Sequence, residues 1–517
     1  MMSGAVGAGG AAGGGDLEAR LGELLFVGVP GTEMTPELAD RLRAIGPSGV
    51  IFFARNYPDA ETAARFGRAV HELLGAPGLP PLVGLDEEGG IVSRLSGFWP
   101  VPPTARAVAA SGGPPLVRDL ATRTARRLLA LGVNLDFAPV LDIHSNPANP
   151  VIGVRSFGTT VSQVTACGRA AIEGFESGGV IPVVKHFPGH GDTSLDSHVA
   201  LPRSDVTETA LRMRELRPFE AAVNQGVPAV LTSHVLFPAL EPDPRSPATI
   251  SHAIVTGLLR GRMRFGGVVI TDALEMEGVH GIGDWGEIAV RAIEAGCDLL
   301  LYEKLEPGPE AALTALRAAL RSGRLSPERL EESLARIRRL RAERAASPPT
   351  LNMRLLESCR DLIPSAELER IASGAIRVLR QGAGAVPLRG AIEVLEVNRP
   401  EGREPIAELL RAHGVTVREH GPDPSGWPRA IEGSALLTVA ARALVGPEDE
   451  RTARAWLHHY PETVTVACLN PHVADHWEEL RTLLATFDNS PASRRALAAR
   501  LVAAAAQQGG TLRSGRG

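Results

Sequence analysis

The sequence predicts an α/β protein with a (β/α)8 TIM-type barrel followed by a smaller C-terminal α/β sandwich domain. A length of 517 residues allows about two or three domains of ordinary size. Over residues 24–302, short apolar runs typical of strands alternate with amphipathic stretches typical of helices. A second, shorter alternation follows residue 372. Such alternation is typical of parallel sheets covered by helices, so we expect both parts to be α/β.

The first part of the chain contains the runs that we expect to form the barrel strands. They are Leu24–Val29, Gly49–Phe53, Leu82–Leu85, Val133–Ala138, Val180–Val184, Ala229–Thr232, Gly267–Thr271 and Asp298–Leu301. The helical stretches between them include Asp59–Leu74, Leu116–Leu131, Val161–Ser177, Val206–Asn224 and Ile288–Ala295. Eight βα units over about 280 residues match the size of a (β/α)8 barrel.

The second part begins after two further helical stretches, Pro309–Ser322 and Pro327–Ala346, of which the latter opens with Ser326 as a cap. The strands expected beyond them are Ile392–Val397, Val415–Arg418, Ala435–Ala440 and Val464–Cys468, and the helices are Pro405–His413, Glu448–His459, Ala474–Ala485 and Ala492–Ala505. The predicted organisation is a flexible tail at 1–16, the barrel at 17–346, a linker at 347–372, the C-terminal domain at 373–508 and a second tail at 509–517.

Composition excludes several classes of function. The chain has 54 Lys and Arg against 59 Asp and Glu, a net charge of −5, so we expect no nucleic acid and no anionic membrane as partner. No apolar run is long enough to span a bilayer, and residues 1–15 lack the features of a secretion signal. A cytoplasmic protein is therefore expected. The four cysteines lie far apart without a C-x-x-C pair, which predicts reduced, buried thiols.

Polar residues follow the predicted strands at the end where a parallel barrel builds its active site. The residues in these positions are Asp86-Glu87-Glu88, Asp136, Asp142, Lys185-His186, His234 and Asp272. Some of them are also explained if they cap strands or pair with one another. As a set, they predict a site rich in acid/base groups at one end of the barrel.

The segment 185–198 is the densest polar stretch, with three histidines, two aspartates and a lysine. Gly189 and Gly191 loosen its backbone, which is typical of a mobile loop with acid/base groups. Histidine and aspartate at short spacing are also metal ligands. However, the ammonium group of Lys185 would repel a divalent cation, so we expect no metal and no other cofactor.

Asp196 and His198 stand two residues apart, so their side chains share one face of an extended loop and can form a hydrogen bond. A carboxylate on one imidazole nitrogen fixes the tautomer and leaves the other nitrogen to transfer a proton. The pair therefore suits an acid/base dyad. The alternative is a histidine that the aspartate only anchors to the loop.

Asp272 follows the apolar run 268–271 and is expected at the mouth of the barrel. Burial beside Lys185 is expected to keep this carboxylate ionised. A carboxylate nucleophile together with a nearby proton donor is what a retaining glycosidase requires.

Four motifs occur in order between Leu21 and Leu340. They are Asp86–Gly90 (DEEGG) with Arg94, Val151–Gly158 (VIGVRSFG), Lys185–Asp192 (KHFPGHGD) followed by Asp196-Ser197-His198, and Thr271–Met276 (TDALEM). Together they resemble the family 3 glycoside hydrolases, in particular the bacterial β-N-acetylglucosaminidase (β-N-acetylhexosaminidase) branch of peptidoglycan turnover in its two-domain form. Ile91 and Asp136 depart from the residues common there, which are arginine and asparagine.

The resemblance implies a role for individual residues. It implies Asp272 as the nucleophile and His198 as the acid/base group oriented by Asp196. The residues that it implies as ligands of the sugar are Asp86, Arg94, Arg155, Lys185 and His186. The expected reaction is retaining hydrolysis of terminal β-linked N-acetylglucosamine from a small saccharide or muropeptide, through a glycosyl-enzyme on Asp272.

Other functions stay open at the level of sequence. A histidine acid/base avoids the repulsion between a carboxylate and incoming phosphate, so the same site suits a β-N-acetylglucosaminide or β-glucoside phosphorylase. A β-glucosidase-type specificity, a non-catalytic sugar sensor and a substrate-assisted mechanism through Asp86-Glu87 are further alternatives. The C-terminal domain shows no acid/base cluster, which predicts a role in packing or in oligomer formation; the sequence leaves the oligomeric state open.

Overall fold

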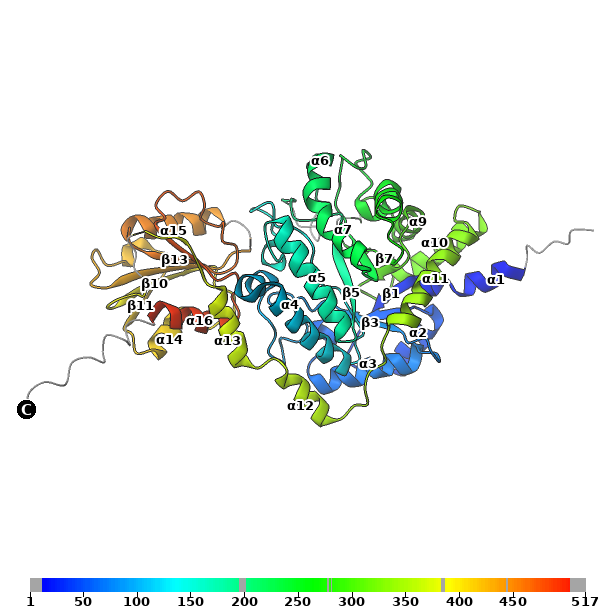
Figure 1. Cartoon of the computed structure of the whole chain (residues 1–517), viewed down its shortest axis with the longest axis horizontal. Helices are drawn as coiled ribbons and strands as arrows, with labels where there is room; N and C mark the ends of the chain where they lie inside the picture. The colour runs from blue at the N-terminus through cyan, green and yellow to red at the C-terminus, as the bar shows by residue number, and fades with distance from the viewer. Residues whose placement is uncertain are drawn as a thin grey trace, which may run out of the picture.

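The computed structural model describes residues 12–194, 201–276, 279, 281–382, 386–442 and 445–502. Two α/β domains lie side by side, with helices α12 (Met353–Asp361) and α13 (Ser365–Ala375) between them in the sequence (Figure 1). None of the described helices combines the length and the apolar character that a bilayer span requires.

The first domain is a parallel barrel. Its strands are β1 (Leu25–Gly28), β2 (Gly49–Ile51), β3 (Leu82–Leu85), β4 (Leu135–Asp136), β5 (Ile181–Phe187), β6 (Ala229–Thr232), β7 (Val268–Ile270) and β8 (Leu300–Tyr302). They pair in the order β7-β6-β5-β4-β3-β2-β1-β8, and a parallel bridge between Ile270 and Leu299 joins the two ends of this order. The predicted (β/α)8 barrel is confirmed.

Helices cover the outside of the barrel between successive strands (Figure 1). They are α2 (Pro36–Ile45), α3 (Ala60–Leu74), α4 (Ala105–Ala130), α5 (Val161–Ser177), α6 (Glu208–Ala210), the π-helix η4 (Leu211–Glu215), α7 (Leu216–Gln225), the π-helix η6 (Ala253–Arg262) and α9 (Trp285–Ala295). Three further helices lie together on the side of the barrel away from the second domain (Figure 1): α1 (Ala12–Ala19), α10 (Gly308–Arg321) and α11 (Pro327–Arg344). Short 3-10 turns complete the domain: η1 (Leu21–Leu24), η2 (Ala54–Asn56), η3 (Gly153–Arg155) and η5 (Ala248–Ile250).

Local sequence explains where these helices begin. The side chain of Asp59 accepts a hydrogen bond from the Thr62 amide and so caps α3, and Thr160 caps α5 in the same way. Ser326 caps α11 through the amide of Arg329, with Pro327 in the first turn as predicted.

The second domain is a six-stranded sheet between two layers of helices. Its strands are β9 (Arg377–Arg380), β10 (Ile392–Val397), β11 (Val417–His420), β12 (Ser434–Val439), β13 (Val464–Ala467) and β14 (Thr482–Ala485), in the order β11-β10-β12-β13-β14-β9. All neighbours are parallel except β9, which is antiparallel to β14. The helices are α14 (Ile406–Ala412), α15 (Pro447–His459) and α16 (Pro491–Val502), with a 3-10 turn η7 (Pro424–Gly426). The predicted α/β sandwich is confirmed.

One predicted helix of this domain is wrong. Residues 474–485 were expected to be helical, whereas residues 482–485 form strand β14. The physical reason is that neighbouring side chains enter opposite cores: Leu483 packs with Trp456 on one face of the sheet, and Leu484 packs with Leu497 on the other. Alternation between two buried faces requires a strand. Residues 482–485 (Thr-Leu-Leu-Ala) do not display this alternation in sequence because all four are apolar or small.

The two domains share a small apolar contact. Phe487 and Leu469 of the C-terminal domain pack with Ala107 of α4 and Val154 of the barrel. The hydroxyl of Thr104 donates a hydrogen bond of 2.6 Å to the carbonyl of Phe487. The C-terminal domain is therefore held against α4 and against the loop that contains Arg155.

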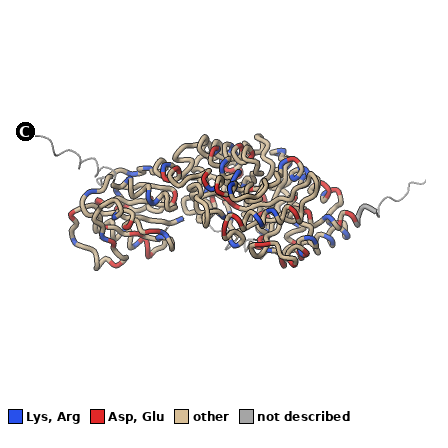
Figure 2. Tube along the Cα trace, turned by 90° about the horizontal axis from the view of Figure 1, so that it is seen from below, with Lys and Arg blue, Asp and Glu red and all other residues tan. Residues whose placement is uncertain are grey.

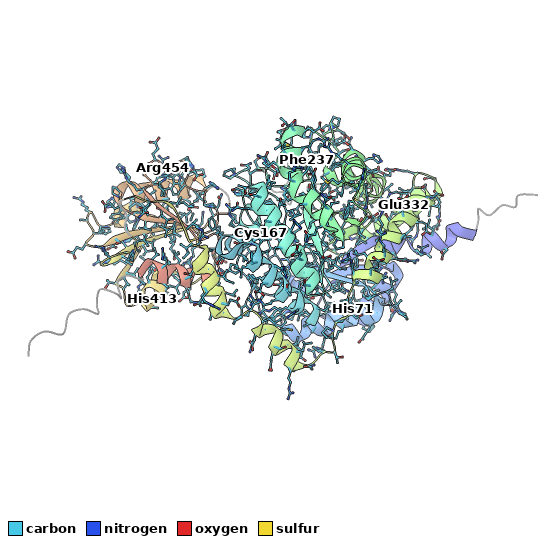
Figure 3. All side chains as sticks on the ribbon, in the orientation of Figure 1. His71, Cys167, Phe237, Glu332, His413 and Arg454 are labelled. Atoms are coloured by element: carbon cyan, nitrogen blue, oxygen red, sulfur yellow. The ribbon has the colours of Figure 1, made fainter. Side chains whose placement is uncertain are left out.

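Charge and thiols match the expectations from composition. Acidic and basic residues are intermixed along both domains (Figure 2), without a broad field of one sign. Cys167 lies within the barrel domain (Figure 3), and this cysteine and the other three are free and buried.

Candidate functional site

A cavity of about 340 Å³ lies at the carboxyl ends of the barrel strands; we call it the substrate cavity. Predicted site residues that line it are Asp86, Arg94, Arg155, Lys185, His186 and Asp272. They come from the loops or ends of β3, β5 and β7 and from the segment around η3. Two further predicted residues, Asp196 and His198, lie outside the described residues.

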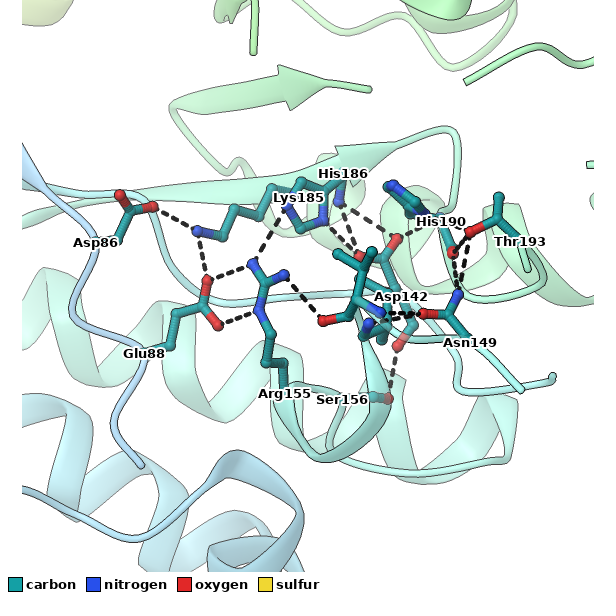
Figure 4. Close-up of polar contacts among 12 residues, drawn as sticks. Asp86, Glu88, Asp142, Asn149, Arg155, Ser156, Lys185, His186, His190 and Thr193 are labelled. Atoms are coloured by element: carbon teal, nitrogen blue, oxygen red, sulfur yellow. Dashed lines mark hydrogen bonds and ion pairs between the residues drawn. The ribbon is translucent and has the colours of Figure 1, made fainter. Parts of the chain in front are cut away.

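A buried network of ion pairs forms one wall of the substrate cavity (Figure 4). The ammonium of Lys185 lies 2.7 Å from Asp86 and 2.6 Å from Glu88. The guanidinium of Arg155 donates two hydrogen bonds of 2.8 Å to the two oxygens of Glu88. Arg94 completes the network at 3.1 Å from Asp86. Bidentate and charge-assisted bonds of this kind fix the direction of each side chain.

Charge balance keeps these groups ionised although they are buried. Burial by itself raises the pKa of Glu88, but the charges of Arg155 and Lys185 outweigh it and hold this pKa well below its usual value. Burial likewise favours neutral Lys185, yet Asp86 and Glu88 raise the pKa of its ammonium above the ordinary value. The wall therefore presents fixed donors and acceptors, as recognition of sugar hydroxyls requires.

Lys185 and Asp272 both line the substrate cavity, but Lys185 forms its ion pairs with other residues. Within the described part of the chain, the ion pairs of Lys185 are with Asp86 and Glu88. Asp86 and Glu88 lie on the loop that follows β3, and both carboxylates are within ion-pair distance of the ammonium. Asp272 instead accepts a hydrogen bond of 2.9 Å from the amide of Ala273.

His186 is oriented by Asp142. Its Nδ1 lies 2.7 Å from Asp142, and its Nε2 lies 3.5 Å from Arg155. The backbone amide of His190 donates to the same carboxylate at 2.6 Å. Burial would raise the pKa of Asp142, but the neighbouring His186 lowers it below its usual value. Asp142 thus fixes the tautomer of His186, with Nδ1 protonated and Nε2 toward Arg155.

His190 also lines the substrate cavity. Its Nδ1 lies 2.8 Å from the hydroxyl of Thr193, and Asn149 donates to its carbonyl at 2.8 Å. Burial, assisted by the charge of His186, lowers the pKa of His190 to about 4. This imidazole is therefore neutral near pH 7.

Glu87 is not among the residues that line the substrate cavity, and it organises the turn after β3. Its carboxylate accepts hydrogen bonds from the Ser93 hydroxyl and the Arg94 amide, each at 2.8 Å, and from the Leu95 amide at 3.3 Å. Burial raises the pKa of Glu87 to about 7. Its amide donates to Asp136, so the departure from asparagine at that position affects the support of the site and not its lining.

His234 supports the nucleophile candidate from behind. Its Nε2 lies 2.9 Å from the carbonyl of Ala273, and its Nδ1 lies 2.8 Å from the hydroxyl of Thr249. The backbone that follows Asp272 is therefore anchored by a fully buried imidazole.

Sequence reasoning missed two charged residues of the substrate cavity, Glu303 and Arg442. Glu303 directly follows β8, so the same rule that singled out the other strand ends could have found it. Arg442 comes from the C-terminal domain, and no local pattern connects it with the barrel. In the described ranges, no group of three His, Cys, Asp or Glu side chains is arranged to hold a metal ion.

Comparison with known proteins agrees with this geometry. Residues 16–340 match the model of the glycosyl hydrolase family 3 N terminal domain. Beta-hexosaminidase A of Pseudoalteromonas piscicida is 31% identical over 393 residues, which cover 72% of this chain and 65% of that protein. The chain thus spans a little less than two thirds of that relative.

Solved structures extend the likeness to both domains. The family 3 beta-N-acetylglucosaminidase of Paenibacillus sp. str. FPU-7 superposes with a TM-score of 0.83 at 34% identity, covering 94% of this chain and 96% of that one. The beta-glucoside phosphorylase BglX superposes with a TM-score of 0.77 over 94% of this chain and 91% of that one, but at 22% identity this likeness shows the fold alone. The match over more than half of the sequence shows that this chain belongs to glycosyl hydrolase family 3.

Proposed function

We propose that this protein is a retaining β-N-acetylglucosaminidase that removes terminal β-linked N-acetylglucosamine from peptidoglycan fragments. Family membership and the names of its relatives support a β-hexosaminidase activity. The observation that supports the chemistry is the position of Asp272: a strand-end carboxylate shares one cavity with the fixed donors and acceptors Asp86, Lys185 and Arg155.

In the proposed mechanism, a carboxylate oxygen of Asp272 attacks the anomeric carbon and the bond to the leaving oxygen breaks. His198, oriented by Asp196, gives a proton to that oxygen. The same imidazole then removes a proton from water, which attacks the anomeric carbon, releases the sugar with its original configuration and frees the Asp272 carboxylate.

The described residues offer few rivals for the proton donor. The charges of Arg155 and Lys185 hold the pKa of Glu88 well below its usual value. His186 likewise lowers the pKa of Asp142. Both carboxyl groups are thus deprotonated, and a carboxylate without a proton cannot act as the acid. His190 is neutral near pH 7 because of its lowered pKa. Apart from the proposed nucleophile Asp272, Glu303 is the described carboxylate that lines the cavity without such pairing, and our tests include it as the alternative acid.

Covalent trapping tests the nucleophile. The wild type and Asp272→Asn are incubated with 5-fluoro-N-acetylglucosaminyl fluoride, and intact-protein and peptide mass spectra are recorded. We expect one added glycosyl group on the peptide that contains residue 272 of the wild type and none on the variant. Turnover without any covalent adduct would instead favour the substrate-assisted mechanism.

Product analysis tests the reaction class and the substrate. With a β-N-acetylglucosaminide, a β-glucoside and a muropeptide, each with and without phosphate, we expect free N-acetylglucosamine at a rate independent of phosphate. Formation of a glycosyl phosphate would overturn hydrolysis in favour of phosphorolysis. Release of glucose faster than of N-acetylglucosamine would overturn the acetamido specificity. Binding of these sugars without turnover would favour a non-catalytic sugar sensor.

A further inference from the structure

A second cavity, of about 540 Å³, lies between the two domains; we call it the interdomain cavity. It shares Ile91 and Arg442 with the substrate cavity, so the two spaces are neighbours that meet at these side chains. Phe98 and Trp99 line it from the barrel, and Arg403 and Asn489 line it from the C-terminal domain. A group that leaves the anomeric carbon toward the C-terminal domain would enter this space.

The chemistry of the interdomain cavity favours an anion. Three arginines and one aspartate are its charged lining residues. Arg495 is 2.6 Å from Glu369, and the charge of Arg403 acts on the buried Asp488. Arg442 has no ion pair with any residue in the described part of the chain. Arg403 likewise forms no ion pair with a described residue, but of these two arginines only Arg442 also lines the substrate cavity. Its exposed guanidinium is therefore the free cation placed where the two cavities meet.

A buried amide provides a second, independent indication of a polar ligand. Asn489 is 6% exposed and lines the interdomain cavity. Its Oδ1 accepts a hydrogen bond of 3.1 Å from Arg494, but its Nδ2 is buried without a partner among the described residues. A buried donor without an acceptor costs free energy, so a ligand oxygen at this point would be favoured.

Contacts between the domains hold Arg442 beside the substrate cavity. A Cβ placed on Gly153 would lie 3.5 Å from the carbonyl oxygen of Arg442. The backbone of Arg442 therefore packs against the loop that contains Gly153 and Arg155. On the same side, the amide of Asn470 donates a hydrogen bond of 2.8 Å to the carbonyl of Pro147. The position of Arg442 is therefore set by the docking of the two domains.

We propose that the interdomain cavity binds the leaving group and selects glycosides whose leaving group has a carboxylate, with Arg442 as the principal cation and Asn489 as a hydrogen-bond donor. This inference rests on the proposed glycosidase function. It assigns the C-terminal domain a part in substrate selection, where the sequence suggested only packing or oligomer formation.

A matched pair of ligands tests this inference apart from turnover. N-acetylglucosaminyl-β-1,4-N-acetylmuramic acid and its lactyl methyl ester differ in the negative charge of the lactyl group and in one methyl group. Their affinities are measured by calorimetry on full-length protein with Asp272→Asn, which retains the cavities but removes the nucleophile. We expect the acid to bind about tenfold more tightly than the ester. This difference is at the lower end of what a hydrogen-bonded ion pair contributes, because the pair is partly exposed to solvent. The preference should weaken as salt is raised.

Variants in the same background locate the effect. Arg442→Ala should reduce the acid-to-ester preference to about twofold or less, and Arg442→Lys should retain part of it. Asn489→Asp, which retains the acceptor for Arg494 but adds negative charge, should also reduce the preference. Arg429→Ala removes an exposed arginine of the same domain outside both cavities and should leave the ratio as it was.

Equal affinity for acid and ester, or an equal loss for both ligands in Arg442→Ala, would overturn the inference. The proposed function is read separately, from hydrolysis of an aryl β-N-acetylglucosaminide by the wild type. Hydrolysis without a preference for the acid would refute the interdomain site alone. A preference in binding without hydrolysis would support the site and refute the glycosidase.

Discussion

Asp272 combines accessibility with little involvement in packing, which is why its chemistry can be tested by substitution. Its carboxylate accepts a hydrogen bond from the amide of Ala273 and forms no ion pair with a described residue. We expect Asp272→Ala to fold like the wild type and to lose about a thousandfold or more in kcat, because the covalent intermediate can no longer form. Steady-state rates and circular dichroism check both parts. Added azide should restore turnover and give the glycosyl azide of opposite configuration; retention of more than a tenth of wild-type activity without azide would refute the assignment.

The acid/base role of His198 predicts a dependence on the leaving group. A sugar alkoxide must be protonated as the bond breaks, whereas a dinitrophenolate leaves without assistance. His198→Ala should therefore lose roughly a hundredfold or more in kcat/KM on a disaccharide, but far less on a dinitrophenyl glycoside. Asp196→Ala should show the same pattern more weakly. Glu303→Gln tests the alternative acid on the same two substrates. If His198→Ala loses equal activity on both substrates, His198 is not the acid and Glu303 becomes the candidate.

At the scale of elements, Asp298 connects the last part of the barrel. Its buried carboxylate accepts hydrogen bonds from the Val269 amide at 3.0 Å, from Ser333 of α11 at 2.7 Å and from Arg336 at 3.0 Å, and it also pairs with Arg260 of η6. One side chain thus joins β7, η6 and α11 at the start of β8.

Removal of this carboxylate should destabilise the barrel strongly. Asp298→Ala leaves Arg260 and Arg336 without their common partner, and we expect the free energy of unfolding to fall by about 3–5 kcal/mol. Urea titration followed by circular dichroism measures the change. Asp361→Ala, which removes an exposed partner of Arg360, is the control and should cost less than about 1 kcal/mol. A loss of similar size in both variants would contradict the connecting role of Asp298.

At the scale of the whole molecule, His144 lies where the domains meet. Its ring centroid is 6.3 Å from that of His472, and both of its nitrogens are buried without a hydrogen-bond partner among the described residues. Burial, together with the positive charges of His472 and Arg106, lowers the pKa of His144 to about 4. The imidazole is thus neutral in the folded protein over the range in which an unfolded chain titrates.

This predicts the sign of a pH effect on stability. The unfolded chain binds a proton near pH 6.5, but the folded protein binds it only near pH 4, so the stability due to neutral His144 is present above pH 6.5 and is lost as pH falls toward 4. We expect His144→Phe to reduce the loss of unfolding free energy between pH 7 and 4.5 by about 2 kcal/mol. His413→Gln, at an exposed histidine, is the control. An unchanged pH slope in His144→Phe would refute the prediction.

The sequence alone determined those features of the protein that depend on local properties, namely hydrophobic periodicity and the residue types at strand ends. Apolar runs of strand length alternating with amphipathic helices indicated the barrel, and polar residues placed directly after these runs indicated Asp86, Lys185, His186 and Asp272 as neighbours. Because parallel strands in a barrel all end on one side, position along each strand translates directly into proximity in space. The cap at Ser326 followed from the same kind of local rule.

Tertiary structure alone decided which of these neighbours pair and what the second domain adds. Lys185 binds Asp86 and Glu88 and not Asp272, because pairing depends on distances across the barrel that no local pattern encodes. The run 482–485 is a strand because its residues enter two different cores, which exist only after the sheet has formed. Arg442, 170 positions after Asp272 in the sequence, reaches the substrate cavity because the docking of two separately folded domains sets its position.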